Sequence, residues 1–130
     1  MKSNNAGKMA SYHYEEILLI LFICSSDMAP YNDRDLILFA EDIEGRIEVL
    51  FDPDFLKSLN KFKVDEDVLY DFGKLRDLLV AMYESQWHKK MNNNNLDWQQ
   101  ARLLAQNILC QLNVEYVEPV FFAEHHLNLP

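Results

Sequence analysis

Three side chains suited to metal binding are consecutive near the C-terminus: Glu124, His125 and His126. A structural metal site needs three or four ligands that converge on one point. In an extended segment two adjacent histidines point to opposite faces, so only one of them could join Glu124. The other histidines, His13 and His88, belong to unrelated segments. We therefore predict a solvent-exposed tail here and assign no metal ligand.

Pairs of aspartates two positions apart are a second candidate for binding a divalent cation. Calcium and magnesium need several oxygen ligands, and a calcium loop uses a glycine for its sharp turn. None of the stretches has such a loop, and two of the pairs fall where we expect a helix to begin. The pairs are Asp33/Asp35, Asp52/Asp54 and Asp65/Asp67. We assign them no cofactor.

No group of residues identifies an enzyme. Cys24 and Cys110 each lie in an apolar segment, where burial would raise the thiol pKa and reduce its reactivity. Asp71-Phe72-Gly73 matches a kinase motif in its letters only, because the chain has neither the glycine-rich loop nor the catalytic loop of a kinase. With three glycines in total, the chain lacks most phosphate-binding and nucleophile motifs. We predict a non-enzymatic protein and assign no catalytic residue.

The most informative feature is the distribution of charge. The formal net charge is −9, and residues 27–54 hold nine acidic residues against Arg34 and Arg46. A surface that serves only solubility mixes charges more evenly. A concentrated negative field attracts a basic partner and steers its approach, and it argues against direct binding of nucleic acid.

The N-terminal part predicts a cytoplasmic protein that does not cross a membrane. Its apolar run, residues 17–24, is far shorter than the roughly 20 residues that span a bilayer. Acidic residues precede the run, and Ser25-Ser26-Asp27 is a poor signal-peptide cleavage site. We expect residues 1–10 to be a flexible leader, with either Met1 or Met9 as the natural start, and residues 11–130 to form one globular domain.

Two segments admit both a strand and a helix. Residues 17–24 suit a strand buried on both faces or a core helix. Residues 36–51 form either a hairpin, with strands 36–41 and 46–51, or a helix, because five apolar residues recur at spacings of three and four. These are Leu36, Ala40, Ile43, Ile47 and Leu50. We favour the hairpin because a type I turn would place Gly45 at its fourth position, where glycine is preferred.

The second half predicts helices over residues 53–62, 65–90 and 97–112, followed by an extended segment over 114–122 in which Pro119 favours a sheet edge. The apolar stripe of the longest helix comprises Val68, Phe72, Leu75, Leu79 and Met82. The expected fold is therefore α+β, with helices packed on a small antiparallel sheet of 17–24, 36–41 and 46–51, with or without 114–122. The alternative is an all-α bundle.

For function we expect an acidic binding protein that neutralises a basic protein partner. Its most concrete form is an immunity- or antitoxin-type inhibitor of a bacterial nuclease-like toxin, in which carboxylates replace the phosphates of the nucleic-acid substrate. The expected contact residues are Tyr31, Asp33, Asp35, Glu41, Asp42, Glu44 and Glu48. The alternative is a structural or adaptor domain that forms a homodimer through the apolar segments near Ile17 and Val120.

Overall fold

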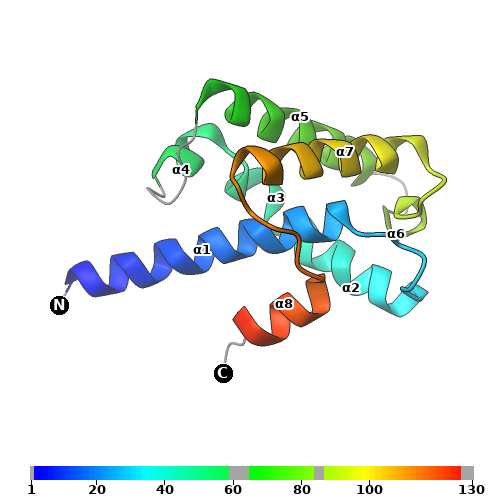
Figure 1. Ribbon diagram of the computed structural model, residues 1–130, viewed down its shortest axis with the longest axis horizontal. Coiled ribbons are helices and arrows are strands. Elements are labelled where there is room, and N and C mark those ends of the chain that lie inside the picture. Colours follow the sequence, from blue (N-terminus) through cyan, green and yellow to red (C-terminus); the bar gives the residue numbers. More distant parts are fainter. Residues whose placement is uncertain (1, 59–64, 84–86, 127–130) are drawn as a thin grey trace.

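A computed structural model describes residues 2–58, 65–83 and 87–126, and the side chains of 12–58, 65–82 and 89–125. Within these ranges every regular element is a helix and no strand is present, so the predicted α+β fold is wrong and the all-α alternative describes the chain (Figure 1). The helices are α1 (Lys2–Ser25), α2 (Asp33–Glu44), α3 (Ile47–Leu50), α4 (Pro53–Ser58), α5 (Glu66–Tyr83), α6 (Trp87–Lys90), α7 (Leu96–Gln111) and α8 (Pro119–His126).

Helix α1 is the centre of the fold. Every residue from Ile17 to Cys24 is buried, because α1 packs against α7 on one side and against α8 and α2 on the other (Figure 1). The prediction of a strand over 17–24 is therefore wrong. A helix that is covered all round needs the same uniformly apolar sequence as a strand buried on both faces, so the run alone does not distinguish them.

The predicted hairpin over 36–51 is also wrong, since α2 and α3 occupy this stretch. A capping box begins α2: the Asn32 side chain accepts a hydrogen bond from the Asp35 N–H (2.9 Å), and the Asp35 carboxylate accepts one from the Asn32 N–H (3.2 Å). Gly45 has φ −78° and ψ −5°, an ordinary right-handed conformation. The turn that favoured the hairpin is therefore absent, and all five residues of the helical pattern, Leu36, Ala40, Ile43, Ile47 and Leu50, are buried.

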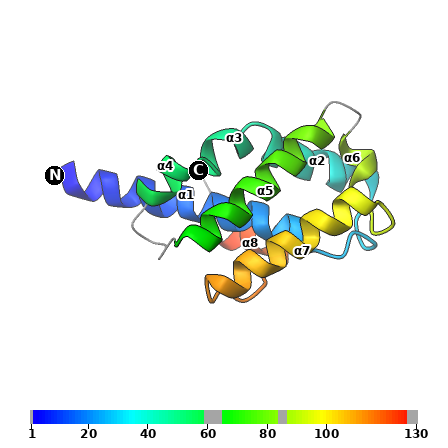
Figure 2. The same ribbon diagram turned by 90° about the horizontal axis from the view of Figure 1, so that it is seen from above.

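Helices α5 and α7 run antiparallel to each other across α1 (Figure 2). The predicted stripe of α5 is buried along its whole length, and Asp65 caps this helix by accepting a hydrogen bond from the Val68 N–H (3.0 Å). Asn95 caps α7 in the same way, since its side chain accepts a hydrogen bond from the Trp98 N–H (3.0 Å). Residues 59–62, the end of the helix predicted over 53–62, lie outside the described residues. The same holds for residues 84–86, which fall within the helix predicted over 65–90.

The extended segment predicted over 114–122 is half wrong, because α8 begins at Pro119. Proline suits the first position of a helix, where its missing N–H costs no hydrogen bond. Glu118 precedes it and accepts a hydrogen bond from the Phe121 N–H at its carboxylate (2.8 Å) and one from the Phe122 N–H at its carbonyl (2.9 Å). The proline therefore marks a helix start and not a sheet edge.

At the N-terminus, residues 2–10 continue α1 as a helix. The predicted flexibility of residues 1–10 stays a prediction. In the described parts of the chain, no helix combines the length and the apolar character that crossing a bilayer requires.

We predict that Gly73→Ala stabilises the protein by about 0.5–1 kcal/mol, because alanine restricts the unfolded chain and favours a helix interior. Gly73 lies within α5, and no neighbouring atom comes within 4 Å of the position that the new Cβ would take. Urea unfolding monitored by circular dichroism measures the change. Phe72→Ala is the control: this neighbour is fully buried, so its truncation costs about 3–5 kcal/mol. A lowered midpoint for Gly73→Ala would contradict the helical environment.

Candidate functional site: an acidic face on α2 and α3

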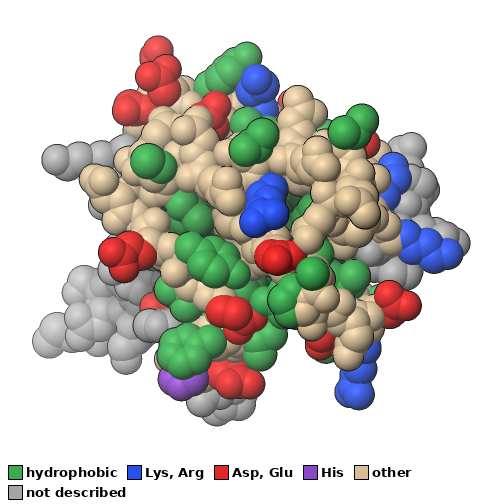
Figure 3. All heavy atoms as spheres, turned by 45° about the vertical axis from the view of Figure 1, so that its right-hand side comes forward, with side chains coloured by type: hydrophobic (Ala, Val, Ile, Leu, Met, Phe, Trp, Pro, Cys, Tyr) green, Lys and Arg blue, Asp and Glu red, His purple; other side chains and the backbone are tan. Residues whose placement is uncertain are grey.

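The outward side of α2 and α3 combines carboxylates with exposed apolar side chains. Leu36, Phe39, Ala40 and Ile43 turn one side of α2 into the core, which leaves the other side to solvent. We call the outward set the acidic face; it comprises Asp33, Arg34, Ile37, Leu38, Glu41, Glu44, Glu48 and Val49. On the face of the molecule drawn in Figure 3, acidic side chains lie next to exposed hydrophobic ones.

The apolar members of the acidic face are well exposed. The exposed fractions are 41% for Ile37, 51% for Leu38 and 61% for Val49. Asp33, Ile37 and Glu41 follow one another at spacings of four, so they share one stripe of α2. The stripe therefore alternates charge and hydrocarbon, and Ile37 is one of three aliphatic side chains on the face that a partner would desolvate.

Of the seven predicted contact residues, four belong to this face: Asp33, Glu41, Glu44 and Glu48. The other three are partly buried and have structural partners. Asp35 completes the capping box of α2, and Asp42 lies beside Arg46. Tyr31 packs edge-to-face against Phe39, with 4.9 Å between ring centroids.

The Tyr31 hydroxyl donates a hydrogen bond to the Glu118 carboxylate, which joins the loop before α2 to the start of α8. Burial raises the pKa of Tyr31, and the hydrogen bond and the charge of Glu118 raise it further. Burial alone would raise the pKa of Glu118, but the hydrogen bonds from Tyr31 and from the N–H groups of α8 outweigh it and lower the pKa. Tyr31 is therefore part of the scaffold.

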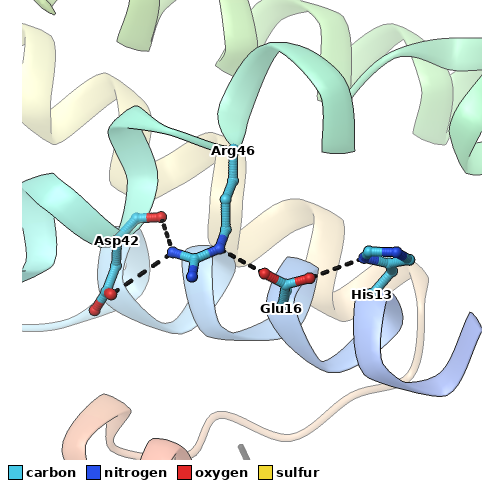
Figure 4. Close-up of polar contacts among 4 residues, drawn as sticks. All are labelled: His13, Glu16, Asp42 and Arg46. Atoms are coloured by element: carbon cyan, nitrogen blue, oxygen red, sulfur yellow. Dashed lines mark hydrogen bonds and ion pairs between the residues drawn. The ribbon is translucent and has the colours of Figure 1, made fainter. Parts of the chain in front are cut away.

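A chain of ionic contacts fixes the end of α2 to α1 (Figure 4). Arg46 Nε donates to Glu16 Oε2 at 2.5 Å, and Arg46 Nη1 donates to the Asp42 carbonyl at 2.7 Å and lies 3.7 Å from its carboxylate. On its other side Glu16 lies 2.8 Å from His13 Nδ1. Burial raises the pKa of Asp42, an effect that the Arg46 charge opposes and Glu41 reinforces. Because Glu16 is buried, this contact ties the junction between α2 and α3 to α1.

Sequence reasoning missed Glu16, Arg46 and Glu118 as structural residues and Ile37 and Leu38 as part of the face. The sequence contains a signal for some of these residues. Asp42 and Arg46 have the spacing of a helical ion pair. If residues 36–51 are taken as helical, Ile37 and Leu38 lie outside the apolar stripe and are therefore expected on the surface. The pairing of Glu118 with Tyr31, which are 87 positions apart, has no sequence signal.

The remaining candidates for chemistry stay apart. Glu124 and His125 are exposed on α8, where the His125 ring stacks on Phe121 with centroids 4.0 Å apart; the His126 side chain lies outside the described set. No cluster of three or more metal-ligating side chains occurs among the described residues. Cys24 is buried, and burial raises its thiol pKa, whereas Cys110 is exposed, contrary to the expectation of two buried thiols.

No protein-family description, curated protein or solved structure matches this chain significantly. The interpretation of the acidic face therefore depends on its own geometry and charge.

We predict that Tyr31→Phe lowers the free energy of unfolding by about 1 kcal/mol near neutral pH, because an ionised Glu118 loses a hydrogen-bond donor in a partly exposed position. The folded-state pKa of Glu118 is lowered, so its contribution is present above the unfolded value and is lost as the pH falls through the folded value. Urea unfolding at neutral and acidic pH should therefore show the two proteins converging in acid. A deficit that does not change with pH would contradict this role of Glu118.

Arg46→Met should destabilise the protein by about 2–3 kcal/mol, because Glu16 then remains buried without its cation. Adding Glu16→Gln should recover part of this loss, since the buried group becomes neutral. Arg34→Met is the matched control: Arg34 is exposed on α2, the helix that precedes Arg46, and its replacement should change stability by no more than about 0.5 kcal/mol. Equal losses for the two arginine variants in urea unfolding would show that the Arg46 contact contributes nothing.

Proposed function

We propose that this protein is a non-enzymatic binding protein that neutralises a basic protein partner through the acidic face of α2 and α3. The observation that supports the proposal best is the exposure of Ile37, Leu38 and Val49 among the carboxylates of that face. Single exposed aliphatic side chains are common on protein surfaces, and Leu96 and Leu103 are examples elsewhere on this protein; α2 and α3 differ in placing three of them among four carboxylates. A protein interface needs both, since apolar contacts at its centre exclude water while charges at its rim determine the partner and the rate of encounter.

The chemistry of the face suits a partner that carries lysines and arginines. Its four carboxylates outnumber its single arginine, Arg34, and the protein as a whole has a formal net charge of −9. In the most concrete form of the proposal, the partner is a nuclease-like toxin. The carboxylates would then occupy the cationic surface that otherwise holds the phosphates of its substrate, as an immunity or antitoxin protein does.

The location that we propose is the cytoplasm. The support is chemical: both cysteines are free, and oxidising compartments favour disulfide formation. The alternative function is a homodimer formed through the segments near Ile17 and Val120. Ile17 is fully buried within the protein and is not available for such an interface, whereas Val120 is exposed.

Charge reversal tests the proposal with two matched triple variants. The face variant replaces Glu41, Glu44 and Glu48 with lysine. The control replaces three exposed carboxylates on α5, on the segment after α7 and on α8, namely Asp77, Glu115 and Glu124, with lysine. Both variants change the net charge by the same amount, so a difference between them reports position and not total charge.

We expect the wild-type protein and the control, used as affinity baits, to retain the same basic protein and the face variant to lose it. With that partner purified, the association rate should fall steeply as salt rises. Leu38→Ala should mainly accelerate dissociation, because it removes an apolar contact and no charge. Equal retention by both triple variants would refute the acidic face as the docking surface, and a stable homodimer with no retained partner would favour the alternative.

A further inference from the structure

A pocket of about 500 Å³, separate from the acidic face, lies where the end of α1 meets α7. Its volume falls within the range of small-molecule sites. Ser25 and Asp27 line it from the end of α1, Arg102 and Leu109 from α7, and Tyr116 from the segment after α7. None of these residues belongs to the acidic face, so the pocket stands independently of the proposed function.

The turn after α7 builds one wall of the pocket. Asn113 adopts φ 58°, the Val114 N–H donates to the Leu109 carbonyl (3.0 Å), and the Asn113 N–H donates to the Cys110 carbonyl (3.1 Å). These are the two hydrogen bonds of a Schellman motif, which reverses the chain at a helix end. The segment then descends across α1 to α8 (Figure 1). The Tyr116 hydroxyl lies 2.6 Å from Ser26 Oγ and holds the segment against α1.

Two polar groups that line the pocket lack partners among the described residues. Ser25 is only 6% exposed, and its hydroxyl makes no hydrogen bond. The Nε of Arg102 is covered in the same way, and its guanidinium makes no ion pair within 4.0 Å in the described part of the chain. Backbone and side-chain hydrogen bonds lower the pKa of Asp27, and the charge of Arg102 across the pocket helps to lower it further. A buried donor without an acceptor is destabilising, and a ligand oxygen would satisfy it.

The remaining lining restricts the charge of such a ligand. Asp27 Oδ1 accepts hydrogen bonds from the Ala29 N–H (2.9 Å) and the Asn93 amide (2.6 Å), which keep this carboxylate at the rim of the pocket. A dianion such as phosphate would be repelled by Asp27, whereas Arg102, whose charge already acts on Asp27, can hold one further carboxylate through its guanidinium. Leu109 and Val114 supply an apolar wall that a simple inorganic anion would leave uncovered.

We propose that this pocket binds a small monocarboxylate with an apolar body. The carboxylate accepts hydrogen bonds from the Arg102 guanidinium and the Ser25 hydroxyl, and the hydrocarbon part covers Leu109 and Val114.

Cys110 lines the same pocket and is exposed, whereas Cys24 is fully buried. Cys110 also lines a neighbouring pocket that contains Lys74 and Leu103. Alkylation of Cys110 in the folded protein therefore reports occupancy of either pocket, and a variant of Arg102, which lines only the first of the two, distinguishes them.

The test measures the rate at which iodoacetamide alkylates Cys110 in the presence of hexanoate, with hexanol, hexylamine and inorganic phosphate as comparison compounds. Hexanoate should slow alkylation several-fold and in a saturable way at concentrations up to about 10 mM. The three comparison compounds should have little effect, since each lacks either the single negative charge or the hydrocarbon.

Two arginine variants decide the role of the guanidinium. Arg102→Gln should weaken protection by hexanoate about ten-fold or more, because a charge-assisted hydrogen bond is lost. Arg76→Gln should retain it, since Arg76 lies on α5 beside Asp77 (3.5 Å) and does not line the pocket. Ser25→Ala should weaken it less and leave urea unfolding nearly unchanged or improved. No protection by hexanoate, equal protection by hexanol, or undiminished protection in folded Arg102→Gln would each overturn the proposal.

Discussion

The burial of one apolar helix on all its sides is the constraint on which the rest of the structure depends. Residues 17–24 of α1 offer hydrocarbon in every direction, so one layer of helices cannot cover them. Helix α7 covers one side, with α5 packed on α7, and α2 and α8 cover the other. The acidic face and the pocket both depend on this arrangement, because α2 supplies most of the face, α7 supplies much of the pocket, and both helices pack on α1.

The two surfaces differ in how they are held. The acidic face depends on a buried ion pair, since Arg46 joins the end of α2 to Glu16 immediately before the apolar run. The pocket depends on backbone geometry at Asn113 and on the contact of Tyr116 with Ser26. Loss of the ion pair would therefore move the acidic face and leave the pocket intact, so their functions can be separated experimentally.

The sequence predicted the elements whose apolar residues follow one period. The stripe of α5, from Val68 to Met82, has helical spacing only, and it is buried as expected. Residues 17–24 are apolar throughout and have no period. Residues 36–51 fit both a strand and a helix period, so the choice of a hairpin there depended on Gly45, whose backbone has an ordinary right-handed helical conformation. The exposed carboxylates of the candidate site could be found from charge. The structural roles of Tyr31 and Glu16 could not, because their partners, Glu118 and Arg46, reach them only through the tertiary fold.

The position of α1 in the chain has a consequence during synthesis. The helices α7 and α8, which cover much of α1, begin only at Leu96 and Pro119, long after α1 in the order of translation. At a synthesis rate of about 5–20 residues per second, roughly 4–14 s pass between the translation of Cys24 and that of Leu96. Of α2, α7 and α8, which pack on α1, only α2 is translated during that interval, so much of the apolar run lacks its cover. We therefore expect α1 to need more co-translational protection than a helix that is covered by the next helix in its chain.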